Sequence, residues 1–111
     1  MAENESGSLA GQVRRLADLV DYQEGSVVSR QVLKTGGGNV TLFAFDQGEG
    51  LTEHTSPFDA LVCVLDGEAE VAISGRPSRV RDGDMILMPA NEPHALRALS
   101  CFKMLLVMIK P

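Results

Sequence analysis

From residue 26 onward the chain is a succession of short apolar runs, each bounded by residues that favour turns. The runs are VVSRQVL (27–33), VTLFAF (40–45), ALVCVL (60–65), EVAI (70–73), SRVR (78–81), MILM (85–88) and FKMLLVMI (102–109). Turns at intervals of about 8–12 residues are typical of all-β sandwiches and barrels, and the runs do not alternate with helical patterns. The sequence therefore predicts an all-β fold, a small antiparallel β-barrel of roughly eight or nine strands.

The residues between the runs predict where strands end. Asp66-Gly67 follows the run 60–65 and is a strong signal for a two-residue hairpin. Ser74-Gly75 closes the next run, and Pro89 stops MILM. We therefore expect a hairpin at Asp66-Gly67.

The segment before the barrel has a different pattern. We expect residues 1–8 to be disordered, residues 9–25 to form an arm or a short helix, and residues 26–111 to form the barrel domain. Apolar residues recur at a spacing that suits one helix face: Leu9, Val13, Leu16 and Val20. Gly11 weakens the helix, so an extended arm and a short helix both remain open.

Size and charge exclude some partners. A chain of 111 residues suffices for one domain. Its net charge is −5 and its basic residues are scattered, whereas nucleic-acid binding needs a concentrated basic patch. No apolar run approaches the roughly 20 residues of a membrane span, and the start MAENESGSL lacks the regions of a secretion signal. We expect a cytoplasmic protein with no nucleic-acid or membrane partner.

Cys63 and Cys101 are expected to be free core thiols rather than a disulfide.

The chain contains two histidines, and each lies close to a glycine-containing turn. His54 follows Gly48 and Gly50, and His94 follows Gly83 and the stop at Pro89. Side chains two apart on a strand share a face, so Ser56 would point the same way as His54. Histidines on separate strands of one barrel can meet in its interior, where they could share a ligand or an ion.

These spacings resemble the two motifs of the cupin superfamily. The first motif is matched by Gly48, His54 and Gly67, with Ser56 and Ala60 in place of its second histidine and its glutamate. The second is matched by Gly83, Pro89 and His94, with Asn91 and Ala98 in place of its second glycine and its asparagine. The resemblance covers about residues 40–109 and implies a jelly-roll barrel, or double-stranded β-helix. The chain is most similar to small single-domain bacterial cupins of the RmlC-like type.

The resemblance also implies a possible metal site with an incomplete ligand set. Metal-binding cupins hold one ion with three histidines and a glutamate, and this chain retains His54 and His94 alone. Asp59, one residue before the glutamate position, is the candidate third ligand. Together the three would resemble the two-histidine-one-carboxylate arrangement that binds iron, and manganese, zinc or nickel are further candidates. The other interpretation is a hydrogen-bonded histidine pair in a polar pocket without metal.

The last strand predicts the wall of the cavity. Four residues share one face of the run 102–109, namely Phe102, Met104, Leu106 and Met108. Lys103 lies on the other face, near water. The cavity around the histidines should therefore be largely apolar, which favours a small ligand with a hydrophobic part. We expect a ligand pocket of His54, Ser56, His94, Phe102, Met104 and Met108.

Three functions remain open from the sequence. The first is a small-molecule-binding barrel, and the alternative is a metal-dependent oxygenase or isomerase using His54, His94 and the candidate third ligand Asp59. The third is a structural interaction protein with an inert barrel. The resemblance further implies a homodimer, paired through its sheets with the N-terminal segment crossing to the partner.

Overall fold

The structure, a computed structural model, describes residues 9–111, so the disorder predicted for residues 1–8 lies outside the described residues. The described part contains nine strands and a 3-10 turn, η2 (Leu16–Leu19). The strands are β1 (Val27–Thr35), β2 (Gly38–Phe45), β3 (Gly50–His54), β4 (Asp59–Asp66), β5 (Glu68–Ile73), β6 (Arg76–Arg81), β7 (Met85–Met88), β8 (His94–Ala98) and β9 (Phe102–Ile109). The bounds of β7 and β9 coincide with the predicted runs.

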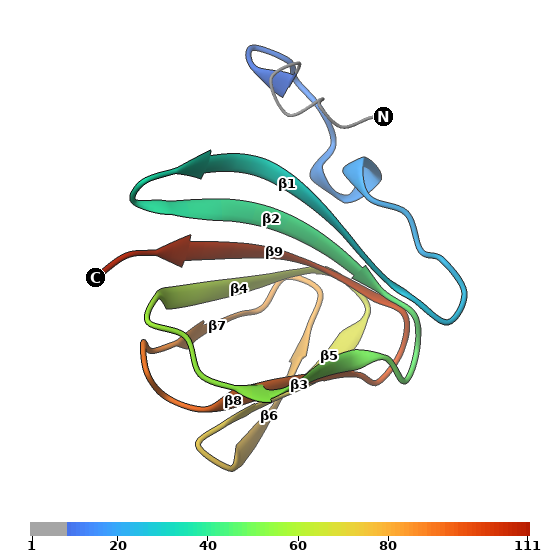
Figure 1. Cartoon of the computed structure of the whole chain (residues 1–111). Coiled ribbons are helices and arrows are strands. Elements are labelled where there is room, and N and C mark those ends of the chain that lie inside the picture. The colour runs from blue at the N-terminus through green and yellow to red at the C-terminus, as the bar shows by residue number, and fades with distance from the viewer. Residues whose placement is uncertain (1–8) are drawn as a thin grey trace.

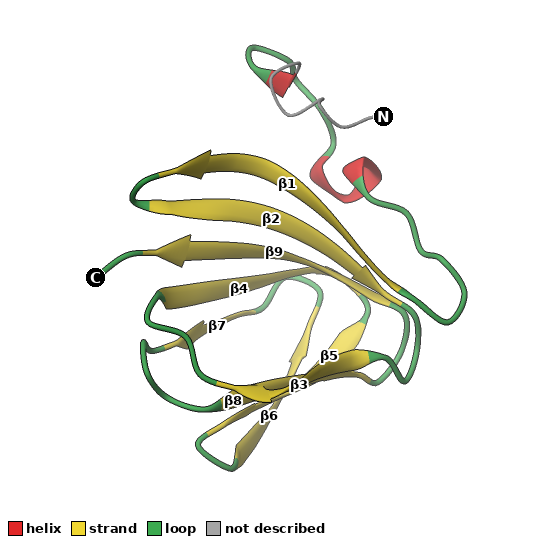
Figure 2. Cartoon of the chain, in the orientation of Figure 1, coloured by secondary structure: helices red, strands yellow, loops and turns green. Residues whose placement is uncertain are grey.

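The strands form two antiparallel sheets that face each other (Figure 1). One has five strands in the order β1-β2-β9-β4-β7, and the other has four in the order β3-β8-β5-β6. Strands and loops account for nearly all of the drawn chain in Figure 2, with helical turns confined to the N-terminal segment. The predicted all-β barrel is therefore confirmed, with the two-sheet arrangement of a double-stranded β-helix.

The hairpin predicted at Asp66-Gly67 is wrong. β4 pairs with β7 and β9, whereas β5 pairs with β6 and β8, so the chain passes from one sheet to the other at this point. Gly67 has φ +79°, and a Cβ there would lie 1.9 Å from the carbonyl oxygen of Cys101. The backbone at Gly67 therefore lies directly against the start of β9 and leaves no room for a side chain. Ser74-Gly75, by contrast, does connect two paired strands, because Ile73 pairs with Arg76.

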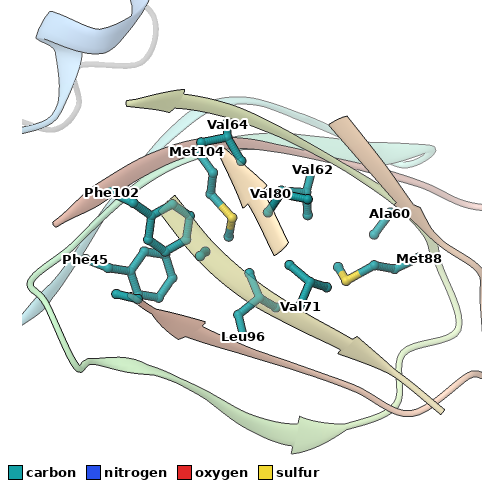
Figure 3. Packing of buried hydrophobic residues seen from close by; sticks show 12 residues of the cluster. Phe45, Ala60, Val62, Val64, Val71, Val80, Met88, Leu96, Phe102 and Met104 are labelled. Carbon is teal, nitrogen blue, oxygen red and sulfur yellow. The ribbon is translucent and has the colours of Figure 1, made fainter. Parts of the chain in front are cut away.

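The core lies between the two sheets and has aromatic packing at one end. The rings of Phe45 and Phe102 stack with centroids 4.5 Å apart, and both side chains are fully buried. Figure 3 shows this stack at one end of the core and the pair Ala60 and Met88 at the other. Burial alternates along β4 and at the start of β9, because every second side chain of a strand faces inward.

The N-terminal arm is extended apart from its short 3-10 turns, and it packs on the outer face of the five-stranded sheet. Leu19 and Val20 are buried there against Leu42 and Ala44 of β2. The residues that would have formed a helix face do not act together, since Val13 is 100% exposed while Val20 is 4% exposed. Of the two alternatives that the sequence left open, the structure has the arm.

Lys103 lies beneath this arm rather than in open water. Its Nζ donates to the carbonyl oxygen of Ala17 at 2.6 Å and lies 5.0 Å from the centre of the Tyr22 ring. Tyr22 in turn donates to the carboxylate of Asp66. These contacts fix the arm to the outer face of the five-stranded sheet.

The two cysteines are free thiols, but neither is a core residue. Both are half-buried. Cys63 lies on β4 between Val62 and Val64, which are buried, so it faces outward. Cys101 donates to the Asp46 carboxylate at 3.2 Å.

Within residues 9–111, helices long and apolar enough to cross a membrane are absent.

Candidate functional site

The two histidines face each other across a pair of neighbouring strands. His54 ends β3 and His94 begins β8, and the two residues are direct partners in the sheet register. Their ring centroids are 4.4 Å apart, with an angle of 71° between the ring planes. His54 is exposed and His94 is 6% exposed. The four-stranded sheet therefore brings together two residues that are forty positions apart in the chain.

Each ring has one nitrogen held by the backbone. The Nδ1 of His54 lies 2.7 Å from the carbonyl oxygen of Thr52, and the Nδ1 of His94 lies 3.1 Å from that of Glu92. A carbonyl oxygen can only accept, so in each ring Nδ1 carries the proton and donates it. The Nε2 of each neutral ring is then a free lone pair, able to accept a hydrogen bond or to bind a metal.

A small cavity lies between the two sheets beside this pair. Its volume is about 60 Å³, well below the roughly 300–1,000 Å³ of sites for drug-sized ligands. The lining residues are Leu51, His54, Ser56, Ala60, Met88, His94, Leu96, Met104, Leu106 and Met108. The cavity can hold a few heavy atoms, with the histidines as its main polar groups.

Five of the six residues expected in the pocket line it, namely His54, Ser56, His94, Met104 and Met108. Phe102 does not. It shares the inward face of β9, as predicted, but it lies at the start of that strand and stacks on Phe45. The Ser56 hydroxyl also accepts from the backbone N–H of Phe58 at 3.1 Å, which leaves it less available to a ligand.

Several lining residues were not predicted, and Met88 and Ala60 are the informative ones. Ala60 of β4 pairs with Met88 of β7 on one side and with Met108 of β9 on the other. The period-two alternation of MILM could have indicated that Met88 faces inward. The register that sets both methionines beside Ala60 is tertiary information.

Asp59 is not brought to the histidines. Its Oδ1 accepts from the backbone N–H of Ala90 at 2.9 Å, and it does not line the cavity. Among residues 9–111, groups of three or more histidine, cysteine or acidic side chains that could hold a metal ion are absent. The residues present therefore do not fit the divalent ion that the cupin ligand set would hold, because the anionic donor is missing.

Burial lowers the pKa of His94 below its ordinary value of 6.5, and the nearby His54 lowers it further, while the hydrogen bond to Glu92 acts in the opposite direction. The unfolded chain consequently binds a proton more readily than the folded chain does. The free energy of unfolding should therefore fall as the pH drops from about 6.5 to the lower folded-state pKa, and level off below it.

We expect NMR titration of the His94 side chain to give a pKa below 6.5. Denaturant unfolding at a series of pH values should show the loss of stability in the same window, and His94→Gln should flatten that part of the curve. A His94 pKa above 6.5, or an unchanged slope in the variant, would contradict this prediction.

Two antiparallel sheets closed over an interior pocket, with histidines on adjacent strands, define a cupin-type barrel. The chain belongs to the cupin family, since residues 41–110 match the family described as "Cupin domain". It is similar to the conserved SPY1581 protein of unknown function from Streptococcus pyogenes, with 39% identity, coverage of 91% of this chain and 89% of that one, and a TM-score of 0.87.

The chain is also similar to two further proteins. A cupin 2 conserved barrel domain protein from Leptotrichia buccalis is 43% identical and superposes with a TM-score of 0.83, covering 86% of this chain and 46% of that one. An uncharacterized protein from Aquifex aeolicus is 26% identical over 102 residues, covering 90% of this chain and 84% of that protein. The family itself follows from the matched cupin domain and from the Streptococcus pyogenes protein, and the names of all three relatives assign no activity.

Proposed function

We propose that the protein is a small-molecule-binding cupin barrel that holds its ligand between His54 and His94. One observation carries the proposal: two imidazole rings 4.4 Å apart, each oriented by a backbone carbonyl, on the wall of a cavity that is otherwise largely apolar. Residues held in this way are pre-organised, which lowers the entropic cost of binding. The cytoplasm is the proposed location, which the two free thiols support.

The site favours a ligand of specific chemistry. Neutral imidazoles with Nδ1 already donating present two acceptors, so the ligand should donate hydrogen bonds at this end. The apolar lining, which includes Leu96 and Leu106, favours a compact hydrophobic part. At about 60 Å³ the cavity limits the buried part to a few heavy atoms.

A panel of small alcohols, phenols and amines should therefore shift the ring resonances of both histidines in NMR titrations. Ala60→Val, which adds two carbons to the cavity wall, should abolish those shifts at a cost of roughly 1–3 kcal/mol in stability. Ala72→Val is the matched control, because Ala72 lies on β5 outside the cavity. Equal binding by the two variants would contradict the proposed pocket.

The alternative function is a metal-dependent cupin enzyme of the oxygenase or isomerase type. It is favoured by the free Nε2 atoms of His54 and His94 at two of the family's ligand positions. It is less well supported, because the carboxylate of Asp59 binds Ala90. Elemental analysis of untagged protein separates the two, since near-stoichiometric iron, manganese, zinc or nickel that is lost in His54→Ala would favour the enzyme.

We also propose that the protein is a homodimer formed through the five-stranded sheet. Part of the outer face of that sheet is covered by the arm, and beyond it Met85, Leu87 and Ile109 are each more than half exposed. Val13 on the arm is 100% exposed, and Figure 1 shows this part of the arm projecting away from the sheets. A two-fold pairing would cover both apolar surfaces at once, since each chain offers both.

Light scattering at micromolar concentration should therefore give the mass of a dimer. Leu87→Lys would place a charge in the exposed apolar part of the proposed interface, and it should weaken dimerisation at least a hundredfold, to monomer. Ser78→Lys, an exposed position on β6 of the other sheet, should leave the dimer intact. A monomeric parent protein would refute the proposal.

A further inference from the structure

The wall of the cavity opposite the histidines carries thioether sulfur atoms. Met88, Met104 and Met108 line it, which are three of the chain's five methionines. Met88 is 3% exposed and Met104 is fully buried. Figure 3 shows the sulfur atoms of both in the space between the sheets. The nitrogen donors thus come from the four-stranded sheet and the sulfur donors from the five-stranded sheet.

Ala60 makes room for two of these thioethers. It pairs directly with Met88 across β4 and β7, and with Met108 across β4 and β9. Paired residues in antiparallel strands point to the same side of the sheet, so all three face the cavity. Ala60 is also the position at which the cupin motif would have its glutamate. Two uncharged sulfur donors therefore flank the place of the missing carboxylate.

The donor set as a whole is neutral and soft. Among the described residues that line the cavity there is no carboxylate, and both histidines have Nε2 free. A divalent ion buried without an anionic ligand keeps its full charge in an apolar environment, which is costly. A monovalent ion carries half that charge, and thioether ligands select copper in its Cu(I) state. Cu(I) also accepts two to four ligands, so the two imidazoles and two thioethers together can hold it.

We propose that the cavity binds one soft monovalent metal ion, Cu(I), between the Nε2 atoms of His54 and His94 and the thioethers of Met88 and Met108. The inference goes beyond the proposed function, because a metal ion is a different occupant of the same cavity from a small organic ligand that donates hydrogen bonds. It differs from the divalent site of the cupin motif in charge and in ligand atoms.

Silver(I) is the first probe, because it shares the ligand preference of Cu(I) and does not change oxidation state. The titration uses protein labelled at the methionine methyl groups, in a Cys63→Ala/Cys101→Ser background, because thiols would compete for silver. We expect the methyl signals of Met88 and Met108 to shift and to saturate at one equivalent. The signal of Met85, which is exposed on the outer face of the same strand as Met88, should stay in place.

Variants test the same sulfur atoms with Cu(I), in the same Cys63→Ala/Cys101→Ser background and in anaerobic competition with a chromophoric chelator. Met88→Leu/Met108→Leu should weaken Cu(I) binding at least tenfold while the fold is kept, because leucine and methionine have similar volumes. Met85→Leu is the matched control and should bind as the parent does. His54→Gln should weaken binding by at least as much as the methionine pair.

Two results would overturn the inference. One is a Met85 signal that moves with the same silver dependence as Met88, which would indicate nonspecific binding. The other is Cu(I) affinity unchanged in Met88→Leu/Met108→Leu. If silver fails to bind while small organic ligands still shift the histidine signals, the metal inference fails and the proposed function stands. If neither binds, both fail.

Discussion

Gly67→Ala is expected to lower the free energy of unfolding by roughly 4 kcal/mol or more, which places it among the rare severe substitutions. The residue has φ +79°, and a Cβ would lie 1.9 Å from the carbonyl oxygen of Cys101 and 2.8 Å from the Cα of Phe102. Both are backbone atoms, so they cannot be displaced by a change of rotamer. The variant should accumulate poorly as folded protein, and denaturant unfolding of what folds measures the loss.

Gly75→Ala separates the two causes of this loss. Gly75 has the same φ, +79°, but a Cβ there would meet nothing within 4 Å. Only the backbone strain remains, which is about 1–2 kcal/mol for a residue with a side chain. The difference between the two variants therefore measures the clash at the corner between the sheets. Equal losses would mean that β9 can move away from Gly67, contrary to the packing described above.

Phe102→Ala is expected to cost about 3–5 kcal/mol, the range for deleting a fully buried aromatic side chain. Domains of this kind have a free energy of unfolding of roughly 5–15 kcal/mol, so this one side chain contributes a large part of it. The ring is 0% exposed and stacks on Phe45 at 4.5 Å. Equilibrium unfolding in urea measures the change in the free energy of unfolding. The dependence of that free energy on urea concentration should be the same in both proteins if unfolding is two-state.

Phe102→Leu is the control for this prediction. It keeps much of the apolar volume, so it should lose roughly half as much stability as the alanine variant. Because the Phe45–Phe102 stack lies at the end of the core away from Ala60 and Met88 (Figure 3), the leucine variant should retain ligand binding at the histidines. Loss of that binding in a folded Phe102→Leu protein would place Phe102 in the pocket after all.

Much of the fold could be predicted because strand periodicity is a local property. MILM and FKMLLVMI are bounded by residues that end strands, and β7 and β9 have the same bounds. The strands that carry the histidines were less evident. β3 is largely exposed, with the pattern of an edge strand, and the inward positions of β8 include His94 and Ala98, which are weak hydrophobic signals.

The direction of the chain after a turn was not predictable from the turn residues. Gly67 and Gly75 have the same φ, yet the chain crosses between sheets at the first and forms a hairpin at the second. A positive φ reverses the local backbone, but the partner of the next strand depends on which residues must be buried. At Gly67 the chain lies against Cys101 and Phe102 of a strand far along the sequence, and such a contact cannot be read from the turn residues.

The histidine pair could be predicted from its spacing and from the resemblance to the cupin motifs, because both residues stand at motif positions. The rest of the cavity could not. The place of Met88 and Met108 beside Ala60 depends on the register of three strands that are far apart in sequence. Asp59 was a reasonable candidate by position, but its carboxylate is used to hold the backbone at Ala90.

The two histidines differ in their access to water, and this difference has a kinetic consequence. His54 is exposed, whereas His94 is 6% exposed. An incoming ligand therefore meets His54 first and reaches His94 only after it has shed most of its water. Changes at His54 should act mainly on the rate of capture, and changes at His94 on how long the complex lasts.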